Sequence, residues 1–267
     1  MNEVALLIPH YNDPTGLILS MASIDAAEKI DVIIIDDGSV KQKIDEEGTR
    51  AAFKAQGTIR FIYMPENLGV DYALNLGLDV IMEENYKYTA RLDAGDVCVK
   101  GRFAIQQQFL EEHPNIKLVG SNVIATDTDG NFIYNIIMPE MHEKIKKRMY
   151  LNSMFMHPTV MFVTDIIHTV GKYPLNYTSA EDYGFFFKVV QNFETRNLQT
   201  PLLRYEINPN GVSGSKRKEQ VSSRLRVIRD NFYFGFYPIY GIIRSIILYH
   251  VPNSWLQKIK KVIHAKM

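Results

Sequence analysis

The sequence predicts an α/β fold in which helices cover a mostly parallel central sheet. Short, continuous apolar runs alternate with amphipathic segments through the first 96 residues, which is the pattern of successive β-α-β units. Each apolar run also ends in a polar stretch that carries a carboxylate or an asparagine. Right-handed crossovers bring the ends of such strands to one edge of the sheet, and ligands bind at this edge in open α/β folds. We therefore expect a binding site there.

The first half of the chain supplies four of the predicted strands. They are apolar enough to be buried on both faces of a sheet, and they cover residues 4–8, 32–35, 59–63 and 88–92. Two helices, one from about Pro14 and one over residues 70–82, are predicted from apolar residues that recur at helical spacing.

The second half alternates less regularly. It predicts helices over residues 103–112, 140–151 and 180–192 and strands over residues 117–119, 132–137, 159–163 and 202–207. We expect residues 1–96 and 97–215 to form two halves of one domain. A separate tail, residues 216–267, is expected to follow.

Charge and cysteine content restrict the classes of function. The chain carries 30 basic and 30 acidic residues, so no overall field favours nucleic acid as a partner. Cys98 is the single cysteine, which excludes an intrachain disulfide and fits a reducing compartment. The first residues lack the basic segment of a signal peptide, and Pro9 interrupts their apolar run. These observations predict a protein on the cytosolic side of the membrane.

The tail differs from the rest of the chain. From Lys216 onward there are eleven basic residues and only two acidic ones, Glu219 and Asp230. Residues 232–250 are almost uncharged and rich in aromatic residues, and lysines follow Trp255. A spanning helix needs about 20 mainly apolar residues, whereas this run is shorter and interrupted. Aromatic residues beside lysines favour the bilayer interface, so we predict an amphipathic helical tail lying on an anionic membrane surface.

Two pairs of acidic residues are candidates for chemistry. Asp93 and Asp96 follow the strand over residues 88–92. Carboxylates held this close repel each other, and a bound cation relieves the repulsion. Glu181 and Asp182 open a predicted helix, where the positive end of the helix dipole stabilises negative charge.

In their order and spacing, the motifs resemble those of family 2 inverting glycosyltransferases of the bacterial surface-polysaccharide type. Each motif alone is common, and the resemblance rests on their succession over residues 4–213. The matching pieces are residues 8–12 (IPHYN), 35–39 (IDDGS), Asn67-Leu68-Gly69 with Asn75, Asp93-Ala94-Gly95-Asp96, residues 157–162 (HPTVMF) and Glu181-Asp182-Tyr183. The resemblance implies a GT-A fold, with a Rossmann-like sheet flanked by helices.

The resemblance also implies roles for individual residues. The donor would be a nucleotide-diphosphate sugar, with UDP favoured, bound by residues 1–96 through Pro9, Tyr11, Asn12, Asp37, Asn67 and Asp93. Asp37 would accept the imide N–H of uracil. Asp93 and Asp96 would hold Mn²⁺ or Mg²⁺ against the diphosphate. Residues 97–215 would bind the acceptor.

Asp182 would act as the general base, oriented by Glu181, and would deprotonate the acceptor hydroxyl in a single inverting displacement. His157 and Tyr183 are candidate acceptor contacts. The sequence departs from the family pattern at Gly95, which replaces a metal-binding acid. Other departures are Leu74, in place of a basic residue, and Asn208, in place of a histidine.

Taken together, the expectation is a hexosyltransferase at the inner face of the cell membrane. Its acceptor would be a lipid-linked glycan in O-antigen or capsule synthesis, and a homodimer is possible. One alternative is a catalytically silent relative that binds nucleotide sugars or partners. Another is a sugar nucleotidyltransferase, although residues 10–13 do not form the Gly-rich basic loop that it would need. The absence of GxxxxGK[ST] and GxGxxG motifs excludes P-loop and dinucleotide-binding enzymes.

Overall fold

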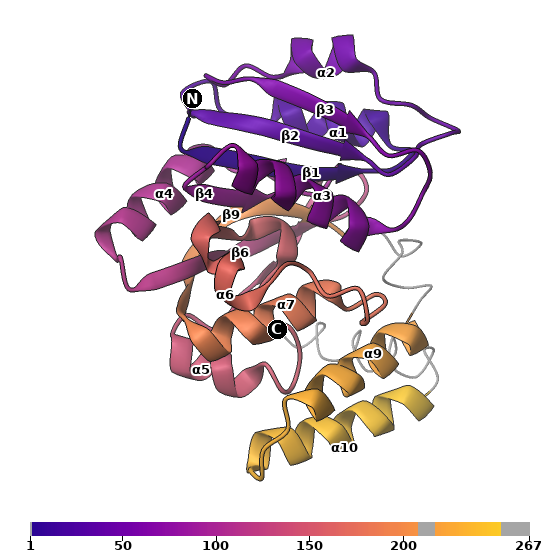
Figure 1. Cartoon of the computed structure of the whole chain (residues 1–267), viewed down its shortest axis with the longest axis vertical. Helices are drawn as coiled ribbons and strands as arrows, with labels where there is room; N and C mark the ends of the chain where they lie inside the picture. Colours follow the sequence, from indigo (N-terminus) through magenta and orange to yellow (C-terminus); the bar gives the residue numbers. More distant parts are fainter. Residues whose placement is uncertain (1, 208–216, 252–267) are drawn as a thin grey trace.

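The computed structural model describes residues 2–207 and 217–251. Residues 2–207 form a nine-stranded mixed sheet with helices packed against it, and a pair of helices follows (Figure 1). Along the sheet the order of the strands is β3-β2-β1-β4-β8-β6-β9-β5, with β7 paired to β6. One continuous sheet therefore joins the two halves of the domain predicted from the sequence.

The four predicted strands of the first half are confirmed, and they are parallel to one another. They are β1 (Val4–His10), β2 (Ile30–Asp36), β3 (Ile59–Tyr63) and β4 (Tyr88–Arg91). Successive side chains on a strand point to opposite faces, so Leu6 and Leu7 lie in two different apolar clusters. The sheet is therefore buried on both sides here, as the unbroken apolar runs predicted.

Helices cover both faces of this half. They are α1 (Pro14–Ala22), α2 (Glu46–Ala52) and α3 (Val70–Glu83). Helix α1 begins at a proline and is capped by Asp13, whose Oδ1 accepts a hydrogen bond from Gly16 N at 2.9 Å. Helix α2 was not predicted because its seven residues show no apolar period.

The second half makes the sheet mixed. Its elements are β5 (Val97–Cys98), α4 (Arg102–Glu112), β6 (Ile116–Thr126), β7 (Phe132–Ile136), α5 (His142–Arg148), a 3₁₀ turn (His157–Thr159), β8 (Met161–Val163), a second 3₁₀ turn (Thr164–Ile166), α6 (Ile167–Val170), α7 (Glu181–Asn192) and β9 (Glu194–Glu206). Strand β8 runs antiparallel to both β4 and β6, whereas β6 and β9 are parallel. The expectation of a mostly parallel sheet therefore holds for the first half only.

Strands β6 and β9 are much longer than predicted. Their middle parts contain buried polar residues, including Asn122 and Asn197, and Pro201, which interrupt any apolar run. Their amide nitrogens donate to distant backbone groups: Asn122 Nδ2 donates to Gln199 O at 2.7 Å, and Asn197 Nδ2 to Pro139 O at 2.9 Å. Tertiary partners thus make a strand of a segment that looks polar in sequence.

The tail begins with two helices, α9 (Arg217–Asp230) and α10 (Phe236–His250), which lie side by side below α7 (Figure 1). They are docked on the domain through hydrogen bonds: Tyr150 Oη donates to Asn231 O, and Arg244 Nη1 donates to Leu151 O, both at 2.7 Å. Within the described part of the chain, no helix is both long and apolar enough to cross a bilayer. The predicted lysine-rich end around Trp255 lies outside the described residues.

Candidate active site

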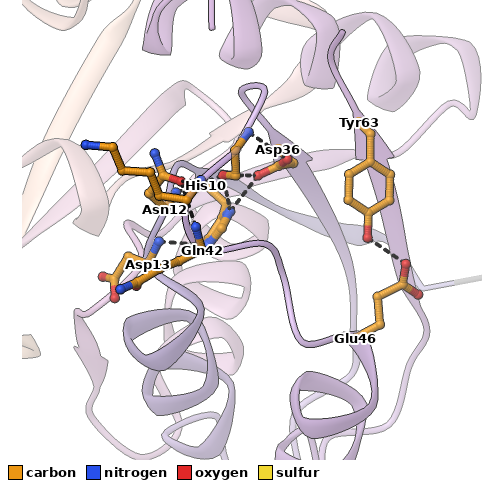
Figure 2. Close-up of polar contacts among 9 residues, drawn as sticks. His10, Asn12, Asp13, Asp36, Gln42, Glu46 and Tyr63 are labelled. Atoms are coloured by element: carbon orange, nitrogen blue, oxygen red, sulfur yellow. Dashed lines mark hydrogen bonds and ion pairs between the residues drawn. The ribbon is translucent and has the colours of Figure 1, made fainter. Parts of the chain in front are cut away.

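The ends of β1 and β2 are joined by a buried polar network centred on Asp36 (Figure 2). Asp36 Oδ1 lies 2.7 Å from His10 Nδ1 and accepts a hydrogen bond from Ser39 Oγ at 2.6 Å. On the other side of the imidazole, Nε2 accepts from Asp13 N at 3.2 Å, which leaves Nδ1 as the donor to Asp36. The first acid of the Asp36–Asp37 pair therefore holds the two strand ends together.

Asn12 shapes the loop that follows β1. Its backbone is left-handed (φ 52°), a conformation that asparagine tolerates. Its Oδ1 accepts hydrogen bonds from Lys41 N and Gln42 N at 2.9 and 3.0 Å (Figure 2). Tyr11 beside it is 49% exposed. An anchored loop with a free aromatic ring is a suitable frame for a flat base.

Asp37 joins β2 to the loop after β3. Its two carboxylate oxygens accept hydrogen bonds from Leu68 N at 2.8 Å and Gly69 N at 3.1 Å. Burial is the largest cause of its raised pKa. A carboxylate has about four acceptor positions, so capacity remains for one more donor, such as an imide N–H. The predicted base-binding Asn67 is exposed in the same loop.

Arg91, at the end of β4, is a buried cation that sequence reasoning missed. Its guanidinium donates to Leu7 O and Leu92 O, to His157 Nε2 at 3.2 Å and to Asp93 Oδ1 at 2.6 Å. The arginine side chain is fully buried, whereas that of Asp93 is 43% exposed. A charged residue inside an apolar strand was the available signal, because a buried charge needs partners.

Asp96 is the second acid of the predicted metal pair. It lies in a tight turn in which Gly95 adopts φ 96° and donates to Gly16 O and Ser20 Oγ, both at 3.0 Å. Asp96 is buried, and its Oδ2 has no hydrogen-bond partner. Burial, followed by repulsion from Asp93, raises its pKa well above the usual range.

Asp93 and Asp96 can coordinate a divalent cation only if the bound ligand supplies further coordinating atoms. An orphaned carboxylate oxygen is a group that a cation would relieve. Among the described residues, however, no group of three or more His, Cys, Asp or Glu side chains could hold a metal ion. The remaining coordination positions would therefore fall to donor diphosphate and water. Leu74, which replaces a basic residue of the family pattern, lies fully buried in the core and cannot contact a phosphate.

Glu181 and Asp182 form the first turn of α7, as predicted. Burial and then the Asp182 carboxylate raise the pKa of Glu181 to about 7. Burial also raises the pKa of Asp182, whereas the hydrogen bond that Tyr183 N donates to its carboxylate at 2.7 Å lowers it. The Arg224 guanidinium on α9 opposes this rise, and Asp93 adds to it. The acid pair thus shares a site with the end of β4.

Asp71, in the first turn of α3, acts electrostatically on both this pair and Asp37. Burial is the main cause of the raised pKa at both Asp37 and Glu181, and the Asp71 carboxylate adds to it at each. Acids from the ends of β2 and β4 and from the starts of α3 and α7 therefore surround one region. Such a concentration of negative charge needs a cation or protons.

His157 and Tyr173 lie beside Arg91, next to the acids. Burial, reinforced by Arg91, holds the pKa of His157 well below its usual range, so the ring is neutral. Tyr173 Oη lies 2.9 Å from His157 Nε2. The backbone of Tyr173 is fixed by Asn75, whose amide exchanges two hydrogen bonds with it, both 2.9 Å long. The role of His157 as an acceptor contact stays a prediction.

Tyr183 was predicted as a second acceptor contact, and the structure places it elsewhere. Its side chain is buried in the core, and its hydroxyl donates to Met149 O. Successive residues of a helix face different directions, so Tyr183 points away from the side on which Asp182 lies. It is a packing residue.

A mixed α/β sheet with acidic strand ends opposite an acidic helix start is the arrangement expected of the GT-A fold. The family model described as glycosyl transferase family 2 matches residues 5–170. The chain belongs to this family, and it is a glycosyltransferase. The family predicted from its motifs is therefore confirmed.

Relatives and solved structures agree with this placement. The amylovoran biosynthesis glycosyltransferase AmsE of Erwinia amylovora is 25% identical over 202 residues, which cover 74% of this chain and 73% of AmsE. TarS 1–349 of S. aureus in complex with UDP matches with a TM-score of 0.63 at 18% identity, over 92% of this chain and 71% of that one. The chain spans 43% of the longer TarS structure.

The mannosyltransferase PcManGT from Pyrobaculum calidifontis, in complex with GDP-Man and Mn²⁺, matches with a TM-score of 0.60 at 14% identity. This match covers 95% of the chain and 71% of PcManGT. At such low identity a structural likeness shows the fold alone. It confirms the GT-A fold that the motifs implied.

Proposed function

We propose that this glycosyltransferase is inverting and moves a hexose from a UDP-sugar to a lipid-linked saccharide in the synthesis of a surface polysaccharide. One observation carries the proposal: burial is the main cause of the raised pKa of Asp182, at the start of α7, and the Asp93 carboxylate, at the end of β4, adds to it. A donor-binding acid and a candidate base therefore face one site. The name of AmsE and the UDP bound to TarS support the polysaccharide and the donor.

The donor would lie across the ends of the parallel strands. Pro9, Tyr11 and Asn12 would frame the base. The Asp37 carboxylate accepts hydrogen bonds from Leu68 N and Gly69 N, and one of its remaining acceptor positions would take the imide N–H. Asp93 would face the ribose and the diphosphate. Because Arg91 already neutralises part of its charge, Asp93 can approach the phosphates with less repulsion.

Asp93 and Asp96 would hold Mn²⁺ or Mg²⁺. When bound, the cation neutralises the diphosphate and makes it a better leaving group. The cation would also act on the two acids themselves. Coordination would give Asp96 Oδ2 the partner that it lacks and would favour the ionised form of both acids.

Asp182 would remove the proton from the acceptor hydroxyl. The acceptor oxygen forms its bond to the anomeric carbon as the bond to the diphosphate oxygen breaks, and the electron pair leaves with the diphosphate. Because burial raises the pKa of Asp182, its carboxylate is a stronger base than an exposed aspartate. Glu181, with a pKa of about 7, would orient the acceptor and share the proton.

The tail supports an acceptor in a membrane. Large apolar residues cover the outer face of α10 at helical spacing, namely Phe236, Ile239, Tyr240, Ile243, Ile246 and Ile247. The opposite, buried face carries the small residues Gly241 and Ser245 and also Pro238. A helix with its large apolar residues outward is inverted relative to a normal surface helix, and this is the pattern of an interfacial helix. This face supports our proposal of peripheral binding to the inner membrane face.

Donor turnover by Asp182→Asn tests the proposal. We expect UDP-sugar transfer or hydrolysis to fall at least about a hundredfold while UDP affinity stays within about twofold, because the base acts only on the acceptor side. Asp165→Asn, an exposed acid far from the site in sequence, serves as control. Unchanged turnover in Asp182→Asn would exclude Asp182 as the base. Donor binding without turnover in the wild type would indicate the catalytically silent relative.

The nucleotide is tested separately by thermal denaturation. A ligand that binds only the native state raises Tm, so UDP-sugars with Mn²⁺ should stabilise the protein more than GDP- or dTDP-sugars do. Stabilisation by a GDP-sugar alone would contradict the choice of UDP.

A further inference from the structure

The turn that leads into α7 has an unusual backbone conformation. Ser179 is left-handed (φ 60°), a conformation that non-glycine residues rarely adopt. The N-cap of α7 is Ala180, which has no side-chain hydrogen bond to the first turn. Glu181 and Asp182 follow directly. The backbone that carries the two candidate catalytic acids therefore lacks a side-chain cap, and its conformation persists only if surrounding contacts impose it.

Helix α9 of the tail supplies such contacts. Tyr177 Oη donates a hydrogen bond to Asp230 Oδ2, and Ser179 Oγ donates one to Glu219 Oε1, both at 2.6 Å. Hydrogen bonds to an ionised carboxylate are stronger than those between neutral groups. Two side chains of the turn before α7 are therefore attached to a helix that lies about 40 residues or more further along the chain.

The positions of the α9 residues fit this role. Glu219, Arg226 and Asp230 are seven and four residues apart, so they lie on one face of the helix. Arg226 Nη1 adds a third contact, to Asn176 O at 2.8 Å. Asp230 is the last residue of α9, where the negative end of the helix dipole disfavours a carboxylate. The hydrogen bond from the tyrosine hydroxyl offsets this disadvantage.

A different face of α9 packs against α7 itself. Val227 and Ile228 belong to the same apolar cluster as Tyr183 of α7. Arg224, three and four residues before them, lowers the pKa of Asp182, which burial raises. Helix α9 therefore contacts both the turn before the acids and the helix that carries them.

We propose that α9 positions Glu181 and Asp182 for transfer, through the hydrogen bonds that Glu219 and Asp230 accept from the turn before α7. Glu219 and Asp230 are then positioning residues, which act through the backbone that enters α7. This inference rests on the proposed function. It gives the first helix of the tail a role in the reaction, separate from the membrane contact proposed for α10.

Glu219→Ala/Asp230→Ala tests the proposal in the full chain, because it removes both acceptors without altering the turn. Both positions are exposed, so Tm should fall by only a few degrees. We expect hydrogen–deuterium exchange at the amides of residues 177–184 to become at least about tenfold faster, with exchange in β1 unchanged. The kcat for sugar transfer should fall at least about tenfold, because the acids are no longer held in place. UDP affinity should stay within about twofold, since the donor-binding loops are not altered.

Two further comparisons separate the hydrogen bonds from other effects. Glu219→Gln/Asp230→Asn keeps an oxygen that can accept from each hydroxyl, so its exchange and kcat should stay close to the wild-type values. Tyr177→Phe should reproduce part of the loss of kcat. Tyr63→Phe should cause none, and it is a matched control because Tyr63 Oη also donates to a carboxylate, Glu46 Oε1, at 2.6 Å (Figure 2).

The contrary results are equally specific. Unchanged exchange in the alanine variant would show that α9 does not hold the turn, and faster exchange with a normal kcat would limit α9 to a structural role. An amide variant as slow as the alanine variant would attribute the effect to charge and contradict the hydrogen-bond mechanism. Asp182→Asn separates the two proposals: full turnover in that variant would exclude the base, while a loss of kcat in the alanine variant would still support positioning by α9.

Discussion

Arg91 and Asp93 form an ion pair that connects the core of the protein to its surface. The Nη2–Oδ1 distance is 2.6 Å, and the arginine is fully buried while the aspartate is accessible. The same guanidinium reaches backbone carbonyls of two strands, Leu7 O and Leu92 O, and the His157 ring. The orientation of Asp93, which we propose as a donor-binding acid, therefore depends on a fully buried residue.

Replacing Arg91 with lysine should destabilise the protein strongly. One ammonium group cannot reproduce the planar set of donors, so buried carbonyls and His157 Nε2 would lose partners. We expect a loss of about 3 kcal/mol in the free energy of unfolding, measured by urea denaturation. Arg148→Lys, at an exposed position on α5, should change it by less than about 0.5 kcal/mol. Equal effects of the two substitutions would disprove this view of Arg91.

Asp93→Asn should weaken donor binding while leaving the fold intact. The amide oxygen can still accept from Arg91, so Tm should shift by only a few degrees. The charge that we propose to hold a cation and the donor is lost, and we expect at least about a tenfold weaker affinity for UDP with Mn²⁺. Titration calorimetry measures this, with Asp165→Asn as the control. A normal affinity would place the cation elsewhere.

The raised pKa of Glu181 makes stability depend on pH. Its folded pKa of about 7 lies above the ordinary glutamate value of 4.5, so the folded state binds the proton more tightly. Wild-type stability is therefore penalised progressively as pH rises from about 4.5 to 7, and the penalty is complete above that.

Glu181→Gln should remove this penalty. We expect the variant to be more stable than the wild type at pH 8, by about 3 kcal/mol, and equally stable at pH 4. Thermal or urea unfolding across this range gives the comparison. A variant less stable than the wild type at pH 8 would show that the carboxylate is favourably paired.

Gly38→Ala should be far more costly than Gly130→Ala. Both glycines have positive φ, 64° and 82°, where a side chain adds about 1 kcal/mol of strain. At Gly38 a new Cβ would also lie 2.3 Å from the backbone carbon of Glu66, whereas Gly130 is surrounded by open space. We expect about 3 kcal/mol against about 1, measured by urea denaturation. Similar losses would mean that the loop after β3 moves freely.

The apolar face of α10 should control membrane binding. Ile243→Asp/Ile247→Asp places two charges on the exposed face without disturbing the buried one. Binding to vesicles rich in phosphatidylglycerol should fall at least about tenfold, with Tm unchanged. If the double variant instead turned a dimer into a monomer while vesicle binding stayed the same, this face would be an interface with a second copy.

Much of the first half could be predicted because its signals are local. Unbroken apolar runs identified β1 to β4, and polar residues directly after them identified the site edge. Strand β9 was mostly missed, since Asn197 and Pro201 break the pattern that a strand normally shows. The difference is that the amide nitrogens of buried residues such as Asn197 donate hydrogen bonds to residues far away in the sequence, and no local pattern records such partners.

The sequence by itself determined the family and the alternation of strands and helices in the first half, because motif order and periodicity are properties of the chain alone. It also selected Asp37, Asp93 and Asp182 as candidate site residues. Only the tertiary structure decided which acids are structural and which are accessible. It assigned Asp36 to a buried network, attached Asp93 to Arg91 and placed Tyr183 in the core. Burial and charge pairing arise between distant segments, and they control each group's protonation and access to a ligand.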